Sequence, residues 1–193
     1  KRLEVVVRSS NYALYGDMSQ RLMSLLKQYC EELEIYSIDE AFAHISRPSN
    51  NDLYPWARRL RALVYQSLGL PIAIGLGSSK VQAKLANQVA KKVATCSGIF
   101  DFSTTKNPND WLERIEIENV WGIGPKVAKR CRSRGISTAR QLRDMPSNQL
   151  REIYGVTGIR IQNELHGNAC LPLQMATKAK RETCVSRSFS RPI

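Results

Sequence analysis

The sequence contains few of the cysteine and histidine residues that cross-link a small domain or bind a soft metal. Its 193 residues include five cysteines and two histidines, and no two cysteines have C-x-x-C spacing. A disulfide framework and a zinc site are therefore not expected. We expect a reducing, cytoplasmic environment. No apolar run approaches the roughly 20 residues that a membrane helix needs, so no membrane partner is expected. Glu4 interrupts the apolar stretch near the start, which argues against a signal peptide.

Acidic residues are scarce in the last part of the chain. Residues 1–120 hold 15 Lys and Arg against 13 Asp and Glu, whereas residues 121–193 hold 14 against 4. Hydrophobic residues make up 42% of the sequence and charged residues 24%, which is ordinary for a folded protein and excludes a disordered tail. The basic excess predicts contact with a polyanion, most simply nucleic acid, and a role in solubility alone is the alternative.

Hydrophobic patterning over residues 1–106 is typical of an α+β domain. Apolar residues at steps of three and four indicate helices, and short runs rich in Val and Ile indicate strands. This order of elements predicts a partial ferredoxin-like sheet with helices on one face. The expected elements are a strand at 3–7, a helix at 15–29, antiparallel strands at 34–37 and 41–45, a loop at 47–52, a helix at 55–68, a fully buried strand at 71–76, a helix capped by Ser79 that runs to 93, and a strand at 98–102.

One strand of that sheet is expected to be missing from the chain. A split βαβ unit begins with a strand that becomes central in the sheet. Here the first helix is preceded only by Leu3–Val7 and by the loop-like Arg8–Asn11. Without a central strand the neighbouring strands would expose unpaired edges. We therefore expect the 193 residues to dimerise or to exchange strands.

Residues 107–193 follow a different pattern. Short helical segments broken by glycines predict a small all-α bundle over residues 107–167, and residues 168–193 predict a linker followed by a strand at 186–190. The expected helices cover residues 110–119, 125–134, 139–145, 147–154 and 159–166.

Asp39 and Glu40 are adjacent carboxylates at the junction of two expected strands. Hard oxygen ligands of this kind suit Mg²⁺, which keeps its other positions for water and substrate phosphates. Two such ions can clamp the attacking and leaving oxygens of a phosphoryl transfer. The alternative is an ordinary acidic hairpin turn without a metal.

Lysines recur along the helix that begins after Ser79. Lys80, Lys84 and Lys91 are spaced by four and seven residues and so share one face. Beside a carboxylate pair such a row suits a nucleoside triphosphate, and a solvated helix face is the alternative. The preceding Gly75–Lys80 lacks the G-x-x-x-x-G-K-[ST] spacing, so a Walker A loop is not predicted.

Gly122 and Gly124 alternate just before an expected helix that carries Lys126 and Lys129. Such a turn exposes backbone N–H groups at a helix N-terminus, which is a favourable place for a phosphate. The pattern predicts contact with a nucleic-acid backbone without reading of its sequence. An ordinary glycine turn between packed helices is the alternative.

Three ordered motifs resemble the Y-family (translesion) DNA polymerases. Ile35–Phe42 resembles the second metal-binding motif of that family, and Ile74–Asn87 followed by Ala90–Lys92 resembles its later palm motif. Trp121–Gly124, followed by Gly135–Thr138, resembles the thumb. Ser9–Ser19 narrows the resemblance to the bacterial DNA polymerase V branch.

The resemblance implies particular roles for these residues. Asp39 and Glu40 would bind metal as catalytic carboxylates, with two Mg²⁺ ions expected in the full-length enzyme. Lys91 would contact the incoming deoxynucleoside triphosphate. Gly122, Gly124, Lys126 and Lys129 would contact primer–template DNA. Lys92 stands where many relatives have proline.

The resemblance also implies a domain organisation and a function. Residues 1–106 would be a partial palm without its first strand and most of the fingers, residues 107–167 a thumb with a helix-hairpin-helix element, and residues 168–193 a linker and the first strand of the little finger. The full-length protein would copy DNA across damaged bases in an SOS-type response, with UmuD′ and RecA filaments as partners, and these 193 residues alone would be inactive. The alternative is a non-catalytic DNA-binding helix-hairpin-helix repair module.

Overall fold

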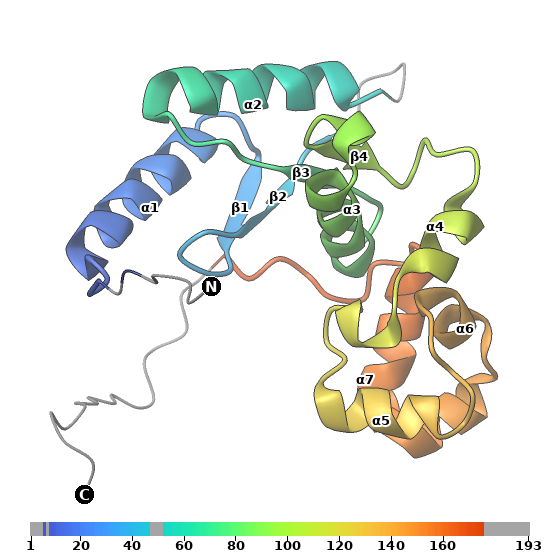
Figure 1. The fold of residues 1–193 in the computed structure, drawn as a ribbon. Helices are drawn as coiled ribbons and strands as arrows, with labels where there is room; N and C mark the ends of the chain where they lie inside the picture. The colour runs from blue at the N-terminus through green and yellow to red at the C-terminus, as the bar shows by residue number, and fades with distance from the viewer. Residues whose placement is uncertain (1–5, 7, 47–51, 176–193) are drawn as a thin grey trace, which may run out of the picture.

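The computed structural model describes residues 6, 8–46 and 52–175. These residues form a mixed α/β unit followed by a lobe of helices, in the order expected from the sequence. Helix α3 lies between the two parts, with α1 and α2 on one side of the molecule and the helical lobe on the other (Figure 1). The expected strand at 3–7, apart from Val6, most of the loop at 47–52 and the strand at 186–190 lie outside the described residues.

The strands form two separate pairs within the described residues. Strand β1 (Glu32–Ile35) pairs with β2 (Ala41–His44) in antiparallel fashion, and β3 (Ile74–Leu76) pairs with β4 (Ile99–Asp101) in parallel. No hydrogen bond joins β2 to β3 in this part of the chain, so the single sheet expected from the sequence is divided in two. The strand expected at 71–76 is also shorter than predicted and only partly buried. Just before β3, the carbonyl of Ala73 accepts from the Asn87 side chain.

Local capping chemistry explains where the first three helices begin and end. Helix α1 (Tyr12–Leu26) starts three residues earlier than predicted, because Asn11 caps it by accepting from the Leu14 N–H. Helix α2 (Tyr54–Leu68) ends at Gly69, whose φ of 67° favours glycine. Helix α3 (Lys80–Lys92) begins at the predicted cap, with the Ser79 hydroxyl accepting from the Gln82 N–H.

The helical lobe consists of short elements joined by tight turns. Helix α7 bends sharply at Gly155, where φ is 63° and ψ is −153°, as the gap between two predicted helices indicated. One isolated antiparallel bridge joins Glu116 to Thr138, which periodicity did not predict. The elements are the 3₁₀ turn η1 (Ala94–Cys96) before β4, then α4 (Pro108–Arg114), the 3₁₀ turn η2 (Ile117–Asn119), α5 (Pro125–Arg132), α6 (Ala139–Asp144) and α7 (Ser147–Leu165).

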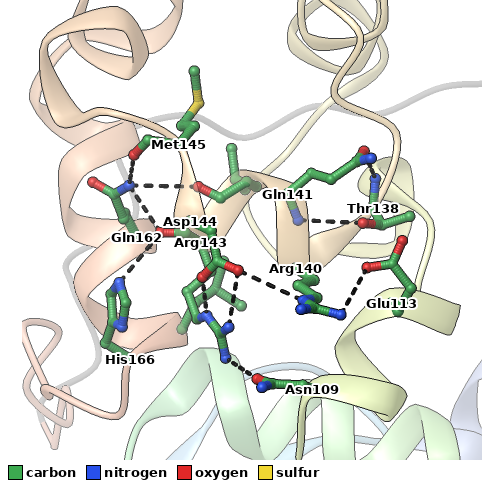
Figure 2. Close-up of polar contacts among 12 residues, drawn as sticks. Asn109, Glu113, Thr138, Arg140, Gln141, Arg143, Asp144, Met145, Gln162 and His166 are labelled. Atoms are coloured by element: carbon green, nitrogen blue, oxygen red, sulfur yellow. Dashed lines mark hydrogen bonds and ion pairs between the residues drawn. The ribbon is translucent and has the colours of Figure 1, made fainter.

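Polar side chains bind the end of α6 to its neighbours (Figure 2). The buried amide of Gln162 on α7 donates to the carbonyls of Arg143 and Met145, at 3.0 and 2.7 Å. The Arg143 guanidinium donates to Asp144 and to Asn109 on α4. The two bonds from Gln162 satisfy carbonyls that α6 leaves open at its C-terminus, so a six-residue helix can end inside the lobe.

The largest hydrophobic core unites α3 with the lobe. Val81 and Leu85 of α3 pack in the same cluster as Leu142, Leu150 and Ile153, all nearly inaccessible to solvent. The lobe is thus built on the same helix that covers β3, and its position relative to the strands is fixed by close packing. Within the described residues, no helix is long and apolar enough to cross a bilayer.

Candidate active site and nucleic-acid interface

Asp39 and Glu40 lie on the turn between β1 and β2. The Glu40 carbonyl accepts from the N–H groups of both Tyr36 and Ser37, at 3.0 Å each, and this closes the turn. The Ser37 hydroxyl donates to Asp39 Oδ1 at 2.7 Å. Asp39 is exposed and Glu40 half-buried, so a tight hydrogen-bonded turn presents both carboxylates beside the end of a strand.

The acidic turn faces helix α3. Lys84 Nζ lies 2.8 Å from Glu40 Oε1, and the same ammonium lies 5.4 Å from the centre of the Tyr36 ring. Asp39, Glu40, Lys84 and Lys91 all line one cavity of about 480 Å³. The carboxylates and the lysine-bearing helix therefore share a cleft, as the sequence argument required. The pairing of Lys84 with Glu40 was not predicted individually, because the two residues are 44 positions apart.

The predicted lysine row divides into three different environments. Lys80 is buried and binds Glu34 as well as the Pro172 carbonyl. Lys84 is paired with Glu40, while Lys91 is exposed near the C-terminal end of α3. The alternative hypothesis, that all three lysines lie on a solvated helix face, is therefore wrong. Lys91 is the member of the row that remains open to a ligand.

Asp39 and Glu40 form a pair of carboxylates rather than a larger cluster. In the described part of the chain, no group of three or more acidic, histidine or cysteine side chains is placed to hold a metal ion. Mg²⁺ is commonly held by one or two carboxylates together with water and substrate phosphates. The pair therefore fits one such ion, and a second ion would need further ligands.

Gly122 and Gly124 form the turn between η2 and α5. Gly122 has a φ of 92°, and a Cβ there would lie 2.8 Å from Ile161 Cδ1, so a larger residue would meet both strain and a clash. Gly124 is the N-cap of α5 and has open space around it. Lys126 and Lys129 are exposed on the helix that follows.

An aromatic contact joins the glycine turn to the acidic turn. The indole N–H of Trp121 donates to the Tyr36 hydroxyl at 3.1 Å, and the two rings meet edge to face with centres 5.8 Å apart. Phe42 of β2 packs against both rings. The predicted DNA-contacting residues do not touch the predicted metal-binding residues directly, but this contact fixes the two turns relative to each other. Sequence reasoning missed it because Tyr36 and Trp121 are 85 residues apart.

Sequence comparison relates this arrangement to known proteins. The family model described as impB/mucB/samB matches residues 1–88. "Protein UmuC" of Salmonella typhimurium is 38% identical over 195 residues, covering all of this chain and 46% of UmuC. The chain is thus similar to UmuC throughout its length, and the match to the impB/mucB/samB family model is confined to residues 1–88. A DNA polymerase IV of Bacillus velezensis is 31% identical over 170 residues, covering 86% of this chain and 40% of that protein. The UmuC-related chain thus spans about half the length of the curated relatives it matches.

Solved structures give the same fold. The crystal structure of DinB from Sulfolobus solfataricus covers 88% of the UmuC-related chain and 50% of its own, with a TM-score of 0.70 and 21% identity. The insertion ternary complex of Dbh DNA polymerase covers 84% and 47%, with a TM-score of 0.67 and 22% identity. The mixed helix-and-sheet architecture expected from the sequence is therefore confirmed, and its fold is similar to that of these two polymerase structures.

Proposed function

We propose that the chain supplies the palm and thumb of a Y-family polymerase that carries out template-directed DNA synthesis across damaged bases in an SOS-type response. The observation that carries the proposal is the acidic turn, which faces the lysines of α3 across a cleft and is joined through Trp121 to a basic helical lobe. Similarity to UmuC and DNA polymerase IV supports the same assignment. In this proposal residues 1–106 are the palm, residues 107–167 the thumb and residues 168–193 the linker and the start of the little finger.

The acidic turn is the proposed catalytic centre. Asp39 and Glu40 would hold Mg²⁺, one ion through this pair and a second in the complete enzyme with ligands from elsewhere. When bound, such ions polarise the phosphoryl oxygens of the substrate. The chain's own part is positional. The Ser37 hydroxyl orients Asp39, and Lys84 orients Glu40 through an ion pair of 2.8 Å.

Lys91 is the proposed contact for the incoming deoxynucleoside triphosphate. Its side chain is exposed and lines the same cavity as Asp39 and Glu40. An ammonium on a flexible stem serves as a point charge for a phosphate. Lys80 is not assigned this role, because its charge is already neutralised by Glu34.

The helical lobe is the proposed contact for primer–template DNA. The backbone N–H groups near Gly122 and Gly124 and the ammonium groups of Lys126 and Lys129 would bind phosphates in a helix-hairpin-helix manner. A hydrogen bond from α7 stabilises the glycine turn, since the Tyr154 hydroxyl donates to the Gly122 carbonyl at 2.7 Å. UmuD′ and RecA filaments are proposed partners on the strength of the resemblance to UmuC alone.

Primer extension tests the proposal. We would place these 193 residues in the matching segment of S. typhimurium UmuC, which aligns with the chain from end to end. With Mg²⁺, deoxynucleotides and a damaged template, the chimera is expected to extend a primer. Asp39→Asn should lower the rate at least about 100-fold, because lost metal binding removes several kcal/mol of transition-state stabilisation. Affinity for primer–template DNA should stay within about twofold.

The exposed Asp17 on α1 provides the matched control, since Asp17→Asn removes an acidic side chain that pairs with Arg21 and is not among the residues lining the cavity. The 193 residues alone are expected to give no synthesis, because one carboxylate pair holds one ion. The basic lobe favours one other candidate, a non-catalytic DNA-binding repair module. If the Asp39→Asn chimera extended the primer at an undiminished rate, the catalytic role of Asp39 would be excluded, and the non-catalytic DNA-binding module would be the better assignment.

A further inference from the structure

We propose that Arg61 of α2 and Lys91 of α3 form a second phosphate-binding pocket, which takes the outer phosphates of the incoming deoxynucleoside triphosphate. The inference deepens the proposed function, because it rests on the assignment of Lys91 to the triphosphate. Arg61 belongs to none of the motifs that the sequence singles out, and its place beside Lys91 comes from the tertiary structure alone.

A second cavity adjoins the proposed catalytic cleft. Its volume is about 390 Å³, and its wall includes Arg61, Lys91, Ser97 and Gly98. Lys91 and residues 71–73 line both this cavity and the cleft that contains the acidic turn. A ligand that Lys91 holds in the cleft can therefore extend into the second cavity along the same side chain.

The guanidinium of Arg61 is anchored at one point and otherwise has no partner among the described residues. Its Nε–H donates to the Ile72 carbonyl at 2.8 Å. Within that part of the chain, no carboxylate forms an ion pair with Arg61 and no acceptor bonds its Nη groups. A half-buried charge without a counter-charge is unfavourable. The Nη groups form a planar fork of donors that matches phosphate oxygens, so an anion is the ligand that this side chain fits.

The backbone at Gly98 leaves room for the guanidinium. Gly98 has a φ of 79°, and a Cβ there would lie 2.7 Å from Arg61 Nε. Only glycine combines this conformation with so close an approach. The Gly98 carbonyl accepts from the Ile74 N–H at 2.9 Å, which ties the turn before β4 to the start of β3. Arg61 is thus held against a fixed turn rather than extended into solvent.

The charge of the cavity wall favours an anion over a metal ion. Arg61 and Lys91 contribute two full positive charges, and no acidic residue is among the described residues that line the cavity. The C-terminus of α3 adds a negative charge of only about half a unit. A divalent cation alone would find no carboxylate here, whereas the outer phosphates of a triphosphate would meet both cationic side chains.

Binding of inorganic tripolyphosphate to the full chain, without divalent cations, tests the pocket. Amide chemical shifts of Ser97 and Gly98 are expected to move on titration, and their midpoint gives the affinity. Arg61→Gln should weaken binding at least about fivefold, because it removes the guanidinium fork. Arg59→Gln provides the matched control, since Arg59 is exposed on the same helix and does not line the cavity, and it should leave the affinity within about twofold.

A second variant keeps Arg61 and its bond to Ile72. Ser97→Asp places a negative charge in the cavity wall, at a φ of 49° that aspartate tolerates, and should weaken binding at least about fivefold. Thr95→Asp, exposed on η1 and outside the cavity wall, should have little effect. Unchanged affinity in both Arg61→Gln and Ser97→Asp would overturn the pocket, as would chemical shift changes confined to the helical lobe.

Primer extension by the UmuC chimera separates this inference from the proposed function. Arg61→Gln should raise the KM for deoxynucleotides at least about fivefold and change kcat by less than about twofold, because it removes binding that is equal in the ground state and the transition state. An unchanged KM together with a severe defect of Asp39→Asn would exclude Arg61 and leave the catalytic centre intact. If the unsubstituted chimera made no DNA, the proposed function would fail, and tripolyphosphate binding would still decide whether the pocket exists.

Discussion

Glu34 and Glu40 lie six residues apart on one hairpin, and each forms an ion pair with a lysine of α3. The two ion pairs differ in burial and in what they hold in place. Lys80 and Glu34 are both about nine-tenths buried, and Glu34 also accepts from the Gln174 N–H. Lys84 and Glu40 are more exposed and border the cleft. The first pair anchors the segment after α7 against the strands, while the second holds a candidate metal ligand.

The buried pair gives a prediction at the scale of one residue. Lys80→Met removes the ammonium and leaves Glu34 as an unpaired buried charge, so the free energy of unfolding should fall by about 3 kcal/mol. Urea denaturation of the chain measures this change. Lys92→Met, at an exposed position of the same helix, should alter stability by less than about 0.5 kcal/mol. Similar losses for the two variants would contradict the assigned role of Lys80.

Asp144 gives a pH-dependent prediction. The hydrogen bond from Arg143 holds the pKa of Asp144 below its ordinary value of 3.8. A carboxyl whose pKa is lower in the folded state stabilises the protein above that ordinary value and loses the effect as pH falls through the folded pKa. Asp144→Asn should therefore cost less than about 1 kcal/mol at pH 7, since solvent screens this pair, and the difference should vanish in strong acid. Urea denaturation of the unsubstituted chain and of Asp144→Asn, from pH 7 to strong acid, measures the difference in unfolding free energy. A difference that stays constant over this range would contradict the prediction.

At the scale of elements, the contact between the β1–β2 turn and the glycine turn connects the strands directly to the lobe. Trp121 combines a hydrogen bond to Tyr36 with edge-to-face packing on Tyr36 and Phe42. Trp121→Phe keeps a ring and loses the N–H, and should cost about 1 kcal/mol in unfolding free energy. Tyr36→Phe should cost a similar amount, and the double variant should cost little more than either, because both remove the same bond. Full additivity in urea denaturation would exclude the coupling.

At the scale of the whole molecule, the uneven charge predicts how the chain binds DNA. Lys126 and Lys129 are exposed on α5, in the part of the chain with the large basic excess. The logarithm of the association constant for duplex DNA should fall linearly with the logarithm of the salt concentration. Lys126→Ala and Lys129→Ala should each reduce the magnitude of this slope by about 1, because each removes one phosphate contact. Lys27→Ala, at the far end of α1, should leave the slope unchanged. Fluorescence anisotropy at several salt concentrations measures the slopes, and equal slopes for all variants would place the DNA contact elsewhere.

Local patterns predicted the elements well where local chemistry decides them. The Ser79 cap, the break at Gly155 and the antiparallel pair around Asp39 and Glu40 all follow from residues near each other in the chain. The start of α1 was predicted too late because the Asn11 cap, rather than the apolar periodicity, sets it. The expected partial sheet is divided into two strand pairs, because pairing between strands depends on partners far along the chain and β2 and β3 do not meet.

The sequence by itself determined the order of helices and strands, the acidic turn and the basic second part, since these depend on short-range spacing and on composition. Only the tertiary structure decided which lysine meets which acid, that Trp121 reaches Tyr36, and that a gap bordered by helices separates β2 from β3. These contacts join residues 44 or more positions apart, and close packing of the core rather than local preference brings them together.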